Sequence, residues 1–305
     1  MTFLLTGADG QLGSELRPLL QARGTLVSCT RRGGSKDRPL DLADATVLTA
    51  LLDEVRPSLI VNAAAYTAVD QAESEPDLAH AVNGVAPGLM ARWAAENDAA
   101  LLHFSTDYVF DGRKASPYLE DDPVAPINAY GRSKLEGERQ IAASACKHLV
   151  MRTSWVYASH GQNFLLKMLE LARDRDHLQV VSDQIGRPTW AGNLARYAVT
   201  AVDRGLLAAP SGIVHAADAG ACSWFEFAGA IFETAVSLGL LDQAPALREV
   251  GSDAFPTAAR RPASSVLATG RLRKLLAIEP AAQRAALAQC LSELRATPTA
   301  NMVSD

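Results

Sequence analysis

Three glycines at a spacing of three residues follow the first apolar run of the chain. Residues 2–6 are expected to form a buried strand, and Gly7, Gly10 and Gly13 come directly after it. Residues 11–21 carry leucines at helical spacing, so the glycines lie in the turn between a strand and a helix. In such a turn the backbone can approach a pyrophosphate, which the amides at the helix N-terminus bind. The spacing predicts dinucleotide binding, the alternative being a turn needed only to pack the helix on the strand.

Apolar runs alternate with amphipathic stretches through the first half of the chain, and each is long enough for one strand or one helix. This alternation is typical of a parallel sheet covered by helices on both faces. We therefore expect an α/β fold built on a doubly wound, Rossmann-like parallel sheet. The expected strands are residues 2–6, 26–30, 59–62, 100–105 and 149–153, and the expected helices are 11–21, 43–55, 76–97 (bent near Pro87) and 130–145.

The second half is less regular and predicts a smaller C-terminal α+β lobe for the substrate. From Pro245 onward we expect mostly short helices and loops, with a frayed tail over residues 297–305. The chain thus divides into a dinucleotide-binding domain over 1–155 and a substrate-binding lobe over 156–305, with some elements crossing back to the cofactor domain. The expected helices of this half are 164–173, 193–204 and 224–240 (with Ser223 as N-cap), and its expected strands are 178–181 and 213–216.

Composition argues against several classes of function. The net charge is −5 and no run of Lys and Arg marks a nucleic-acid surface, so we expect no nucleic-acid partner. The first apolar run has no basic region before it, and no apolar stretch approaches the ~20 residues that span a bilayer, so we expect neither a signal peptide nor a membrane anchor. Cys29, Cys146, Cys222 and Cys290 show no metal-ligand or disulfide spacing, which favours free thiols in a cytoplasmic protein.

The end of the second expected strand is where such folds contact the adenosine ribose. An acidic residue there would bind the 2′-hydroxyl of NAD, but this chain has Arg31 and Arg32. Arginine suits a 2′-phosphate because its planar fork makes two hydrogen bonds at once. The pattern favours NADPH, and the alternative is two solvated arginines with NADH also accepted. Asp41 and Leu42 follow, and Asp41 can either reach the adenine or cap the next helix.

Small and polar side chains follow the third and fourth expected strands. Ala63 and Ala64 leave room for a cofactor across the sheet edge, and Thr106 presents a hydroxyl where the fourth strand ends. Ligands of doubly wound folds bind outside these carboxyl ends. The next helix begins with Tyr130, so Thr106 and Tyr130 are expected to converge as the two donors that a developing alkoxide needs.

Tyr130 and Lys134 lie four residues apart and therefore share one face of that helix. An ammonium beside a phenol favours the phenolate, so we expect Lys134 to lower the pKa of Tyr130 from its reference near ~10. A tyrosine tuned in this way can give a proton to a carbonyl oxygen near neutral pH. The pair predicts the acid–base half of carbonyl reduction, the alternative being an exposed Tyr and Lys on a helix surface.

Five stretches together resemble the extended short-chain dehydrogenase/reductase superfamily and, within it, the dTDP-4-dehydrorhamnose reductase family. They are GADGQLG at 7–13, NAAAYTAVDQAE at 62–73, STDYVFDG at 105–112, YGRSK at 130–134 and RTSWVY at 152–157. The resemblance covers nearly the whole chain. It implies an oxidoreductase of cell-surface polysaccharide biosynthesis, which uses NADPH to reduce the 4-keto group of dTDP-4-dehydro-6-deoxy-L-mannose to dTDP-L-rhamnose.

The resemblance also implies roles for the residues that match its motifs. Tyr130 would protonate O4 of the keto sugar, Thr106 would hydrogen-bond the carbonyl, and Lys134 would hold the nicotinamide ribose. Thr106, Asp107 and Trp155 match substrate contacts. From the resemblance and the arguments above, the predicted cofactor-binding residues are Gly7, Gly10, Gln11, Leu12, Gly13, Arg31, Asp41, Leu42, Ala63, Ala64, Tyr66, Tyr130 and Lys134.

Some members of the family dimerise through a magnesium ion held by three glutamates. Glu15 and Glu293 match two of these positions, but the third falls near Gly192, which has no carboxylate. A hard cation needs several oxygen ligands, so we expect no metal site, while a homodimer stays open. The six histidines show no metal-ligand spacing either, and none is predicted to be catalytic.

Two other functions fit the same fold. An epimerase or dehydratase acting on another nucleotide sugar would return the hydride and so would not consume the cofactor. A non-catalytic regulator, similar to the regulatory subunit of methionine adenosyltransferase, would bind the cofactor without turnover. The presence of Thr106, Tyr130 and Lys134 together favours an enzyme.

Overall fold

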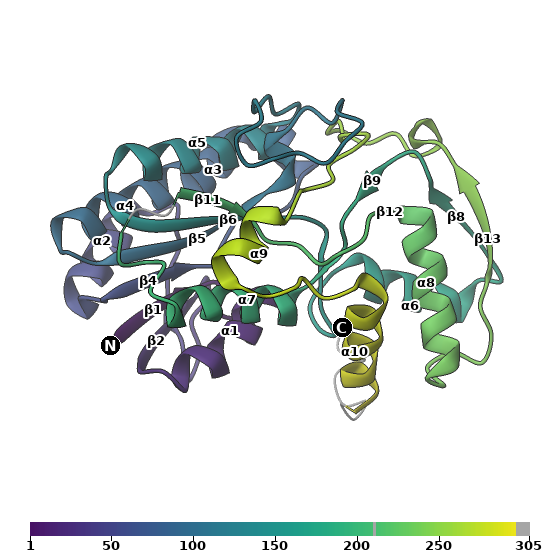
Figure 1. Cartoon of the computed structure of the whole chain (residues 1–305), viewed down its shortest axis with the longest axis horizontal. Helices are drawn as coiled ribbons and strands as arrows, with labels where there is room; N and C mark the ends of the chain where they lie inside the picture. The colour runs from purple at the N-terminus through teal and green to yellow at the C-terminus, as the bar shows by residue number, and fades with distance from the viewer. Residues whose placement is uncertain (210–211, 297–305) are drawn as a thin grey trace.

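A parallel sheet of seven strands forms the centre of the computed structural model, which describes residues 1–209 and 212–296. The strand order is β11-β6-β5-β4-β1-β2-β3 (Figure 1), and every neighbouring pair is parallel. Every residue of β5 is buried, because a central strand of such a sheet is covered on both faces. The strands are β1 (Thr2–Thr6), β2 (Thr25–Thr30), β3 (Arg38–Pro39), β4 (Leu59–Asn62), β5 (Ala100–Thr106), β6 (Lys147–Thr153) and β11 (Gly212–His215).

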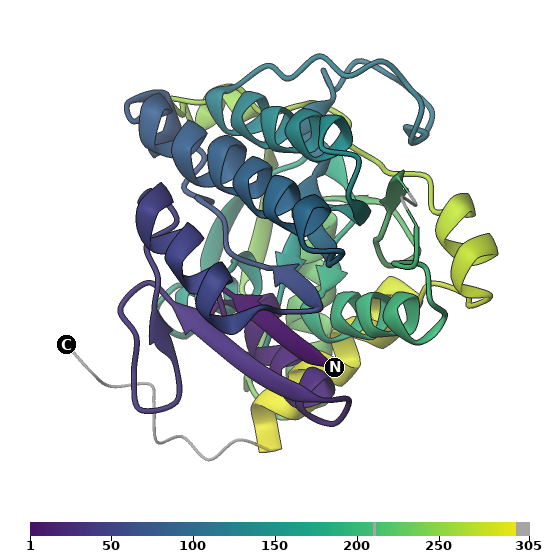
Figure 2. The ribbon, with the colours of Figure 1, turned by 90° about the vertical axis from the view of Figure 1, so that its left-hand side faces the viewer.

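Helices cover both faces of this sheet (Figures 1 and 2), which confirms the predicted α/β class. Successive residues of a strand point to opposite faces. Phe3 and Leu5 accordingly pack in one core with α1 (Gln11–Gln21), α7 (Ala191–Asp203) and α9 (Gly270–Leu276), whereas Leu4 packs in another. The helices of that second core are α2 (Ala45–Val55), α4 (Ala86–Glu96) and α5 (Ala129–Ala143).

The helix predicted over residues 76–97 is continuous but not uniform. It consists of α3 (Pro76–His80), the π-helical turn η2 (Ala81–Val85) and α4. The irregular turn therefore lies just before Pro87 and not at it. Pro87 follows that turn within the continuous helix, so its missing backbone N–H removes one hydrogen bond to the preceding turn.

The second half contributes a separate apolar core and three two-stranded pairings. Ser223 caps α8 with a full capping box, as predicted. The strand β13 and the long helix α10 were not expected from the sequence. The elements are β7 (Val156–Tyr157), α6 (Phe164–Asp174), β8 (His177–Val181), β9 (Ile185–Gly186), β10 (Thr189–Trp190), β12 (Cys222–Ser223), α8 (Trp224–Ser237), β13 (Ala246–Val250) and α10 (Gln283–Ala296), with 3-10 turns η1 (Gln71–Glu73), η3 (Asp107–Val109) and η4 (Ser252–Ala254).

Some second-half elements join the large sheet and its covering helices. β11 pairs with β6, and α7 and α9 share a core with α1. The division of the chain near residue 155 stays a prediction, and the tail expected at 297–305 lies outside the described residues. Cys29, Cys146, Cys222 and Cys290 are free and buried, as expected. Within residues 1–209 and 212–296, no helix is long and apolar enough to cross a membrane.

Candidate active site

A cleft of about 530 Å³ opens at the carboxyl ends of the central strands. Five strands each contribute a residue at or just beyond their end, namely Thr6, Cys29, Ala63, Ser105 and Thr153. This is the edge at which doubly wound folds bind their ligands. The predicted cofactor-binding residues that line the cleft are Gly7, Gly10, Gln11, Leu12, Arg31, Asp41, Leu42, Ala63, Ala64, Tyr66, Tyr130 and Lys134.

The glycine turn both lines the cleft and packs α1 against the turn after β1. Gly7 has a φ of +66°, and a Cβ there would lie 2.7 Å from the backbone nitrogen of Ala64. Gly10, at the start of α1, lines the cleft with Gly7. Gly13 does not line it, because it packs beneath the turn, where a Cβ would lie 2.0 Å from the carbonyl oxygen of Gly7. Gly13 is therefore a packing residue that lets α1 approach the turn.

The loop after β4 is held to α5 by one buried side chain, Asn83. Its Oδ1 accepts a hydrogen bond from the backbone nitrogen of Tyr66 at 2.9 Å. Its Nδ2 donates to the carbonyl oxygen of Tyr66 and to the Ser133 hydroxyl, both at 3.0 Å. The Tyr66 hydroxyl also donates to Glu75 at 2.8 Å. Tyr66, a predicted cofactor contact, is therefore fixed through both its backbone and its side chain.

Thr106 and Tyr130 converge as the sequence predicted. Thr106 ends β5, Tyr130 is the second residue of α5, and the Thr106 hydroxyl lies near enough to the phenol to affect its pKa. The ring of Tyr108 packs edge-on against that of Tyr130, with centroids 5.8 Å apart. Burial, helped by the nearby Asp107 and opposed by Thr106, raises the pKa of Tyr130 to about 12. The phenol is therefore a protonated donor at neutral pH.

The prediction that Lys134 lowers the pKa of Tyr130 is wrong, because β5 holds the lysine. Lys134 is only 2% exposed, and its Nζ donates to the carbonyl oxygen of Phe104 at 2.6 Å. The Nε2 atom of His103 lies 3.3 Å from the same Nζ. Burial lowers the pKa of Lys134 to about 8. Burial and the lysine's charge lower the pKa of His103, so its ring is neutral.

Arg31 and Asp41 face each other at the end of the cleft reached by β2. Their Nε and Oδ2 atoms are 3.9 Å apart, and the Arg31 side chain is 75% exposed. Asp41 does not cap α2, because Asp44 accepts hydrogen bonds from the first amides of that helix. α2 consequently begins at Ala45 and not at residue 43.

None of the three predicted substrate contacts, Thr106, Asp107 and Trp155, is among the residues that line this cleft. Asp107 is buried, and burial raises the pKa of its carboxyl to about 7. Trp155 has a φ of 47° and stacks on Trp224, with ring centroids 3.4 Å apart. Trp224 lines a second cavity, of about 620 Å³, between the second-half elements. The Trp155 ring therefore packs against a residue that lines the second cavity but does not line the cavity itself.

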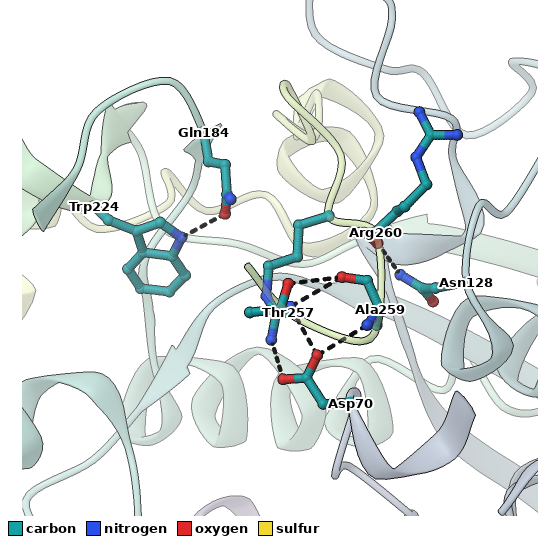
Figure 3. A network of polar contacts seen from close by, with 8 residues as sticks. Asp70, Asn128, Gln184, Trp224, Thr257, Ala259 and Arg260 are labelled. Carbon is teal, nitrogen blue, oxygen red and sulfur yellow. Dashed lines mark hydrogen bonds and ion pairs between the residues drawn. The ribbon is translucent and has the colours of Figure 1, made fainter. Parts of the chain in front are cut away.

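A segment that we call the strap, residues 257–265, links the second cavity to the start of α5 (Figure 3). The backbone nitrogen of Ala259 donates to Asp70 Oδ1 at 3.0 Å. The side-chain amide of Asn128, which caps α5, donates to the carbonyl oxygen of Arg260 at 2.8 Å. Figure 3 also shows the Arg260 side chain pointing away from Asp70. The strap was not predicted as part of the site.

The positions implied for a magnesium ion do not form a three-carboxylate site. A Cβ at Gly192 would lie 2.6 Å from the Trp190 ring, so this position is packed against an indole. Burial and the nearby negative charge of Glu15 raise the pKa of the Glu293 carboxyl. Among residues 1–209 and 212–296, no group of three or more His, Cys, Asp or Glu side chains could hold a metal ion. We therefore derive no step through a metal.

Sequence reasoning missed several residues that line the cleft. Ser105 is the next-to-last residue of β5 and Thr153 is the last residue of the neighbouring β6. Their buried hydroxyls have no hydrogen-bond partner within the described residues. Such orphaned donors at a cleft point to a polar ligand. Their place at strand ends, beside Thr106, is the signal that would have found them. His103 was also missed as a contact of Lys134, since two residues of different elements meet only in the fold.

The model of the RmlD substrate binding domain family matches residues 1–296. The chain belongs to this family. Two relatives, both dTDP-4-dehydrorhamnose reductases, cover it almost completely. That of Burkholderia thailandensis is 41% identical over 96% of this chain and 99% of its own, and that of Escherichia coli K12 is 39% identical over 97% and 99%.

Solved structures agree with this RmlD family assignment. The dTDP-4-dehydrorhamnose reductase of Clostridium acetobutylicum superposes with a TM-score of 0.87 at 33% identity, covering 97% of this chain and 100% of that one. The enzyme of Bacillus anthracis, in complex with NADP, gives a TM-score of 0.86 at 33% identity, covering 96% and 99%. Both likenesses extend over the cleft and the second cavity, since nearly the whole chain is covered.

Proposed function

We propose that this chain is an NADPH-dependent dTDP-4-dehydrorhamnose reductase, which reduces the 4-keto group of dTDP-4-dehydro-6-deoxy-L-mannose to give dTDP-L-rhamnose. The observation that carries the proposal is one cleft shared by the glycine turn, Tyr130 and Lys134 in a member of the RmlD family. The turn accounts for a dinucleotide, and the tyrosine for proton transfer to a carbonyl oxygen.

The residues of the cleft fit NADPH. Gly7 and Gly10 line the cleft and have no side chain that would keep a phosphate away from the backbone. The buried hydroxyls of Ser105 and Thr153 have no hydrogen-bond partner among the described residues. Arg31 lines the cleft beside Asp41 and would meet the 2′-phosphate. When bound, NADPH supplies the hydride that reaches C4 of the sugar.

The protein's own part in the reduction is proton transfer and positioning. Tyr130 would donate its phenolic proton to O4, since burial keeps it protonated at neutral pH. Thr106, at the end of β5 near that phenol, would donate to the same oxygen as negative charge develops there. Lys134, anchored on Phe104, would hold the nicotinamide ribose. Asp107 and Trp155, which line neither cavity, would contact the sugar as the resemblance implies.

The test is spectrophotometric. Purified protein is mixed with NADPH and the 4-keto sugar nucleotide generated in situ, and the absorbance of the reduced cofactor is followed. Stoichiometric loss of that absorbance is expected, with dTDP-L-rhamnose as product. A retained cofactor with an epimerised product would instead identify an epimerase, and binding without turnover would identify a regulator.

Arg31→Ala should weaken the preference for NADPH over NADH. A hydrogen bond to a charged group contributes enough to change kcat/KM for NADPH by about tenfold, whereas kcat/KM for NADH should change little. The matched control is Arg32→Ala, since Arg32 is exposed and adjacent but does not line the cleft. An unchanged ratio of the two kcat/KM values in Arg31→Ala would contradict the proposal that Arg31 binds the 2′-phosphate.

NADPH affinity should decline as pH rises through about 8. The pKa of Lys134 is lowered from 10.5 to about 8 by burial, so the ammonium that would bind the cofactor is lost above that pH. The unfolded chain keeps this proton up to about 10.5. Lys134 therefore makes the protein more stable with rising pH between these values. Fluorescence titration across pH measures the affinity, and Lys134→Met should bind weakly without this pH dependence.

Two further proposals concern the protein's setting. Four cysteines are free and buried, namely Cys29, Cys146, Cys222 and Cys290. Free thiols suit a reducing compartment, so we place the activity in the cytoplasm.

A homodimer stays a prediction. Analytical ultracentrifugation tests it, and a measured mass equal to that of a single chain would contradict it.

A further inference from the structure

An ion pair joins the strap to the loop before η1. Arg261 Nη2 donates to Asp70 Oδ2 at 2.6 Å, and Arg261 Nη1 donates to Oδ1 at 3.0 Å, so the pair is bidentate. The backbone nitrogen of Ala259 donates to the same Oδ1, and Arg261 Nη1 also donates to the carbonyl oxygen of Ala259. The carboxylate thus fixes both the side chain and the backbone of the strap.

The same two segments each form a hydrogen bond with the N-terminus of α5. On the strap side, the carbonyl oxygen of Arg260 accepts from Asn128, whose Oδ1 caps α5 by accepting from Gly131 N at 2.7 Å. On the η1 side, Glu73 Oε1 accepts from the backbone nitrogen of Ala129 at 2.7 Å. Because Asp70 directly precedes η1 and pairs with the strap, these contacts form a closed ring that includes Asn128 and Ala129 at the start of α5.

The ring also touches Tyr130 through a second aromatic side chain. The charge of the Arg261 guanidinium lies near enough to the phenol of Tyr108 to lower its pKa, against the larger effect of burial. The Tyr108 ring in turn packs edge-on against the Tyr130 ring. The position of Tyr130 therefore depends on the start of α5 and on the Tyr108 ring. The ring of contacts connects the start of α5 to Asp70 and Arg261, and Tyr108 lies near the charge of Arg261.

We propose that Asp70 and Arg261 are positioning residues that hold Tyr130 at the reacting carbonyl by closing this ring of contacts. The inference rests on the proposed function for its kinetic readout only. The two side chains are 44% and 23% exposed, so their pairing contributes little to overall stability. A small displacement of a proton donor, in contrast, can cost about 10²-fold in rate.

The chain contains a matched pair elsewhere. Arg23 and Asp203 also form a bidentate pair, at 2.8 and 2.7 Å, between segments far apart in sequence. Their side chains are 29% and 48% exposed, much like those of Arg261 and Asp70. Neither Arg23 nor Asp203 lines a described cavity. Asp203→Asn therefore removes a comparable ion pair without touching the ring.

The kinetic experiment compares Asp70→Asn with Asp203→Asn. Asp70 lines neither cavity, so Asp70→Asn should lower kcat by about tenfold or more with the dissociation constant for NADPH unchanged. Asp203→Asn should leave kcat unchanged. The double variant Asp70→Asn/Arg261→Gln should lose no more than Asp70→Asn, because the two residues act as one unit. Losses that multiply, or a kcat of Asp70→Asn equal to that of the wild type, would overturn the proposal.

A ¹⁹F NMR experiment tests the position of Tyr130 independently of the protein's substrate. The full chain is labelled with 3-fluorotyrosine, and the ¹⁹F resonance of Tyr130 is assigned by its absence from Tyr130→Phe. Asp70→Asn should shift this resonance, whereas Asp203→Asn should not. An unmoved resonance overturns the proposal even if the wild type proves inactive on the sugar. Should Asp70→Asn fail to fold, Arg261→Lys keeps the charge, loses the fork and is expected to give the same shift.

Discussion

Replacing Tyr130 with phenylalanine should lower turnover by about 10²- to 10⁴-fold, the usual contribution of a positioned proton donor. The phenol lines the cleft and has a raised pKa, so it is protonated at neutral pH and can donate its proton to the carbonyl oxygen. NADPH binding should change little, because the ring that lines the cleft is retained and only the hydroxyl is lost. Steady-state kinetics and cofactor titration measure the two effects separately.

Tyr157→Phe provides the control for this change. Tyr157 is also buried, and its hydroxyl has no partner among the described residues. Its loss should leave both kcat and stability close to those of the wild type. Retention of most of the turnover by Tyr130→Phe would refute the role of Tyr130 as the acid.

Replacing Glu138 with glutamine should lower the free energy of unfolding by about 3 to 5 kcal/mol, as expected when one partner of a buried ion pair is removed. Glu138 on α5 forms a bidentate pair with Arg152 on β6, at 2.9 and 2.6 Å, and both side chains are only 3% exposed. The change would leave the Arg152 cation buried without its counter-charge. Urea denaturation measures the loss.

Glu170→Gln is the matched surface control for this second prediction. Glu170 pairs with Lys167 three residues away, and the two side chains are 60% and 56% exposed. Exposed pairs contribute only about 0 to 1 kcal/mol. A similar loss in both variants would mean that the buried pair adds nothing beyond an ordinary surface pair.

Features that depend on neighbouring residues could be predicted from the sequence. The glycine turn, the alternation of strands and helices and the Ser223 cap each arise within one short stretch, so periodicity and residue type suffice. The strand β13 escaped prediction because most of its residues are exposed and its apolar residues do not alternate. Its partner β8 is distant in sequence, and that pairing is what makes it a strand.

The chemistry of the site depended more on distant contacts. The i, i+4 spacing correctly placed Tyr130 and Lys134 at one cleft. It could not show that the carbonyl oxygen of Phe104 would hold the lysine, nor that burial would raise the pKa of the phenol. The strap was missed for the same reason, since Asp70 and Arg261 are 191 residues apart in the chain.

Because of the π-helical turn η2, the contacts of Asn83 depend on the number of residues in the helix formed by α3, η2 and α4. Asn83 reaches the Tyr66 backbone and the Ser133 hydroxyl at once, and it does so from a turn that is one residue wider than an α-helical turn. Removing a single residue from Ala81–Val85 would rotate Asn83 by about 100° around the helix axis. Both contacts would be lost together, so evolution can exchange side chains along this helix more readily than it can change the number of residues.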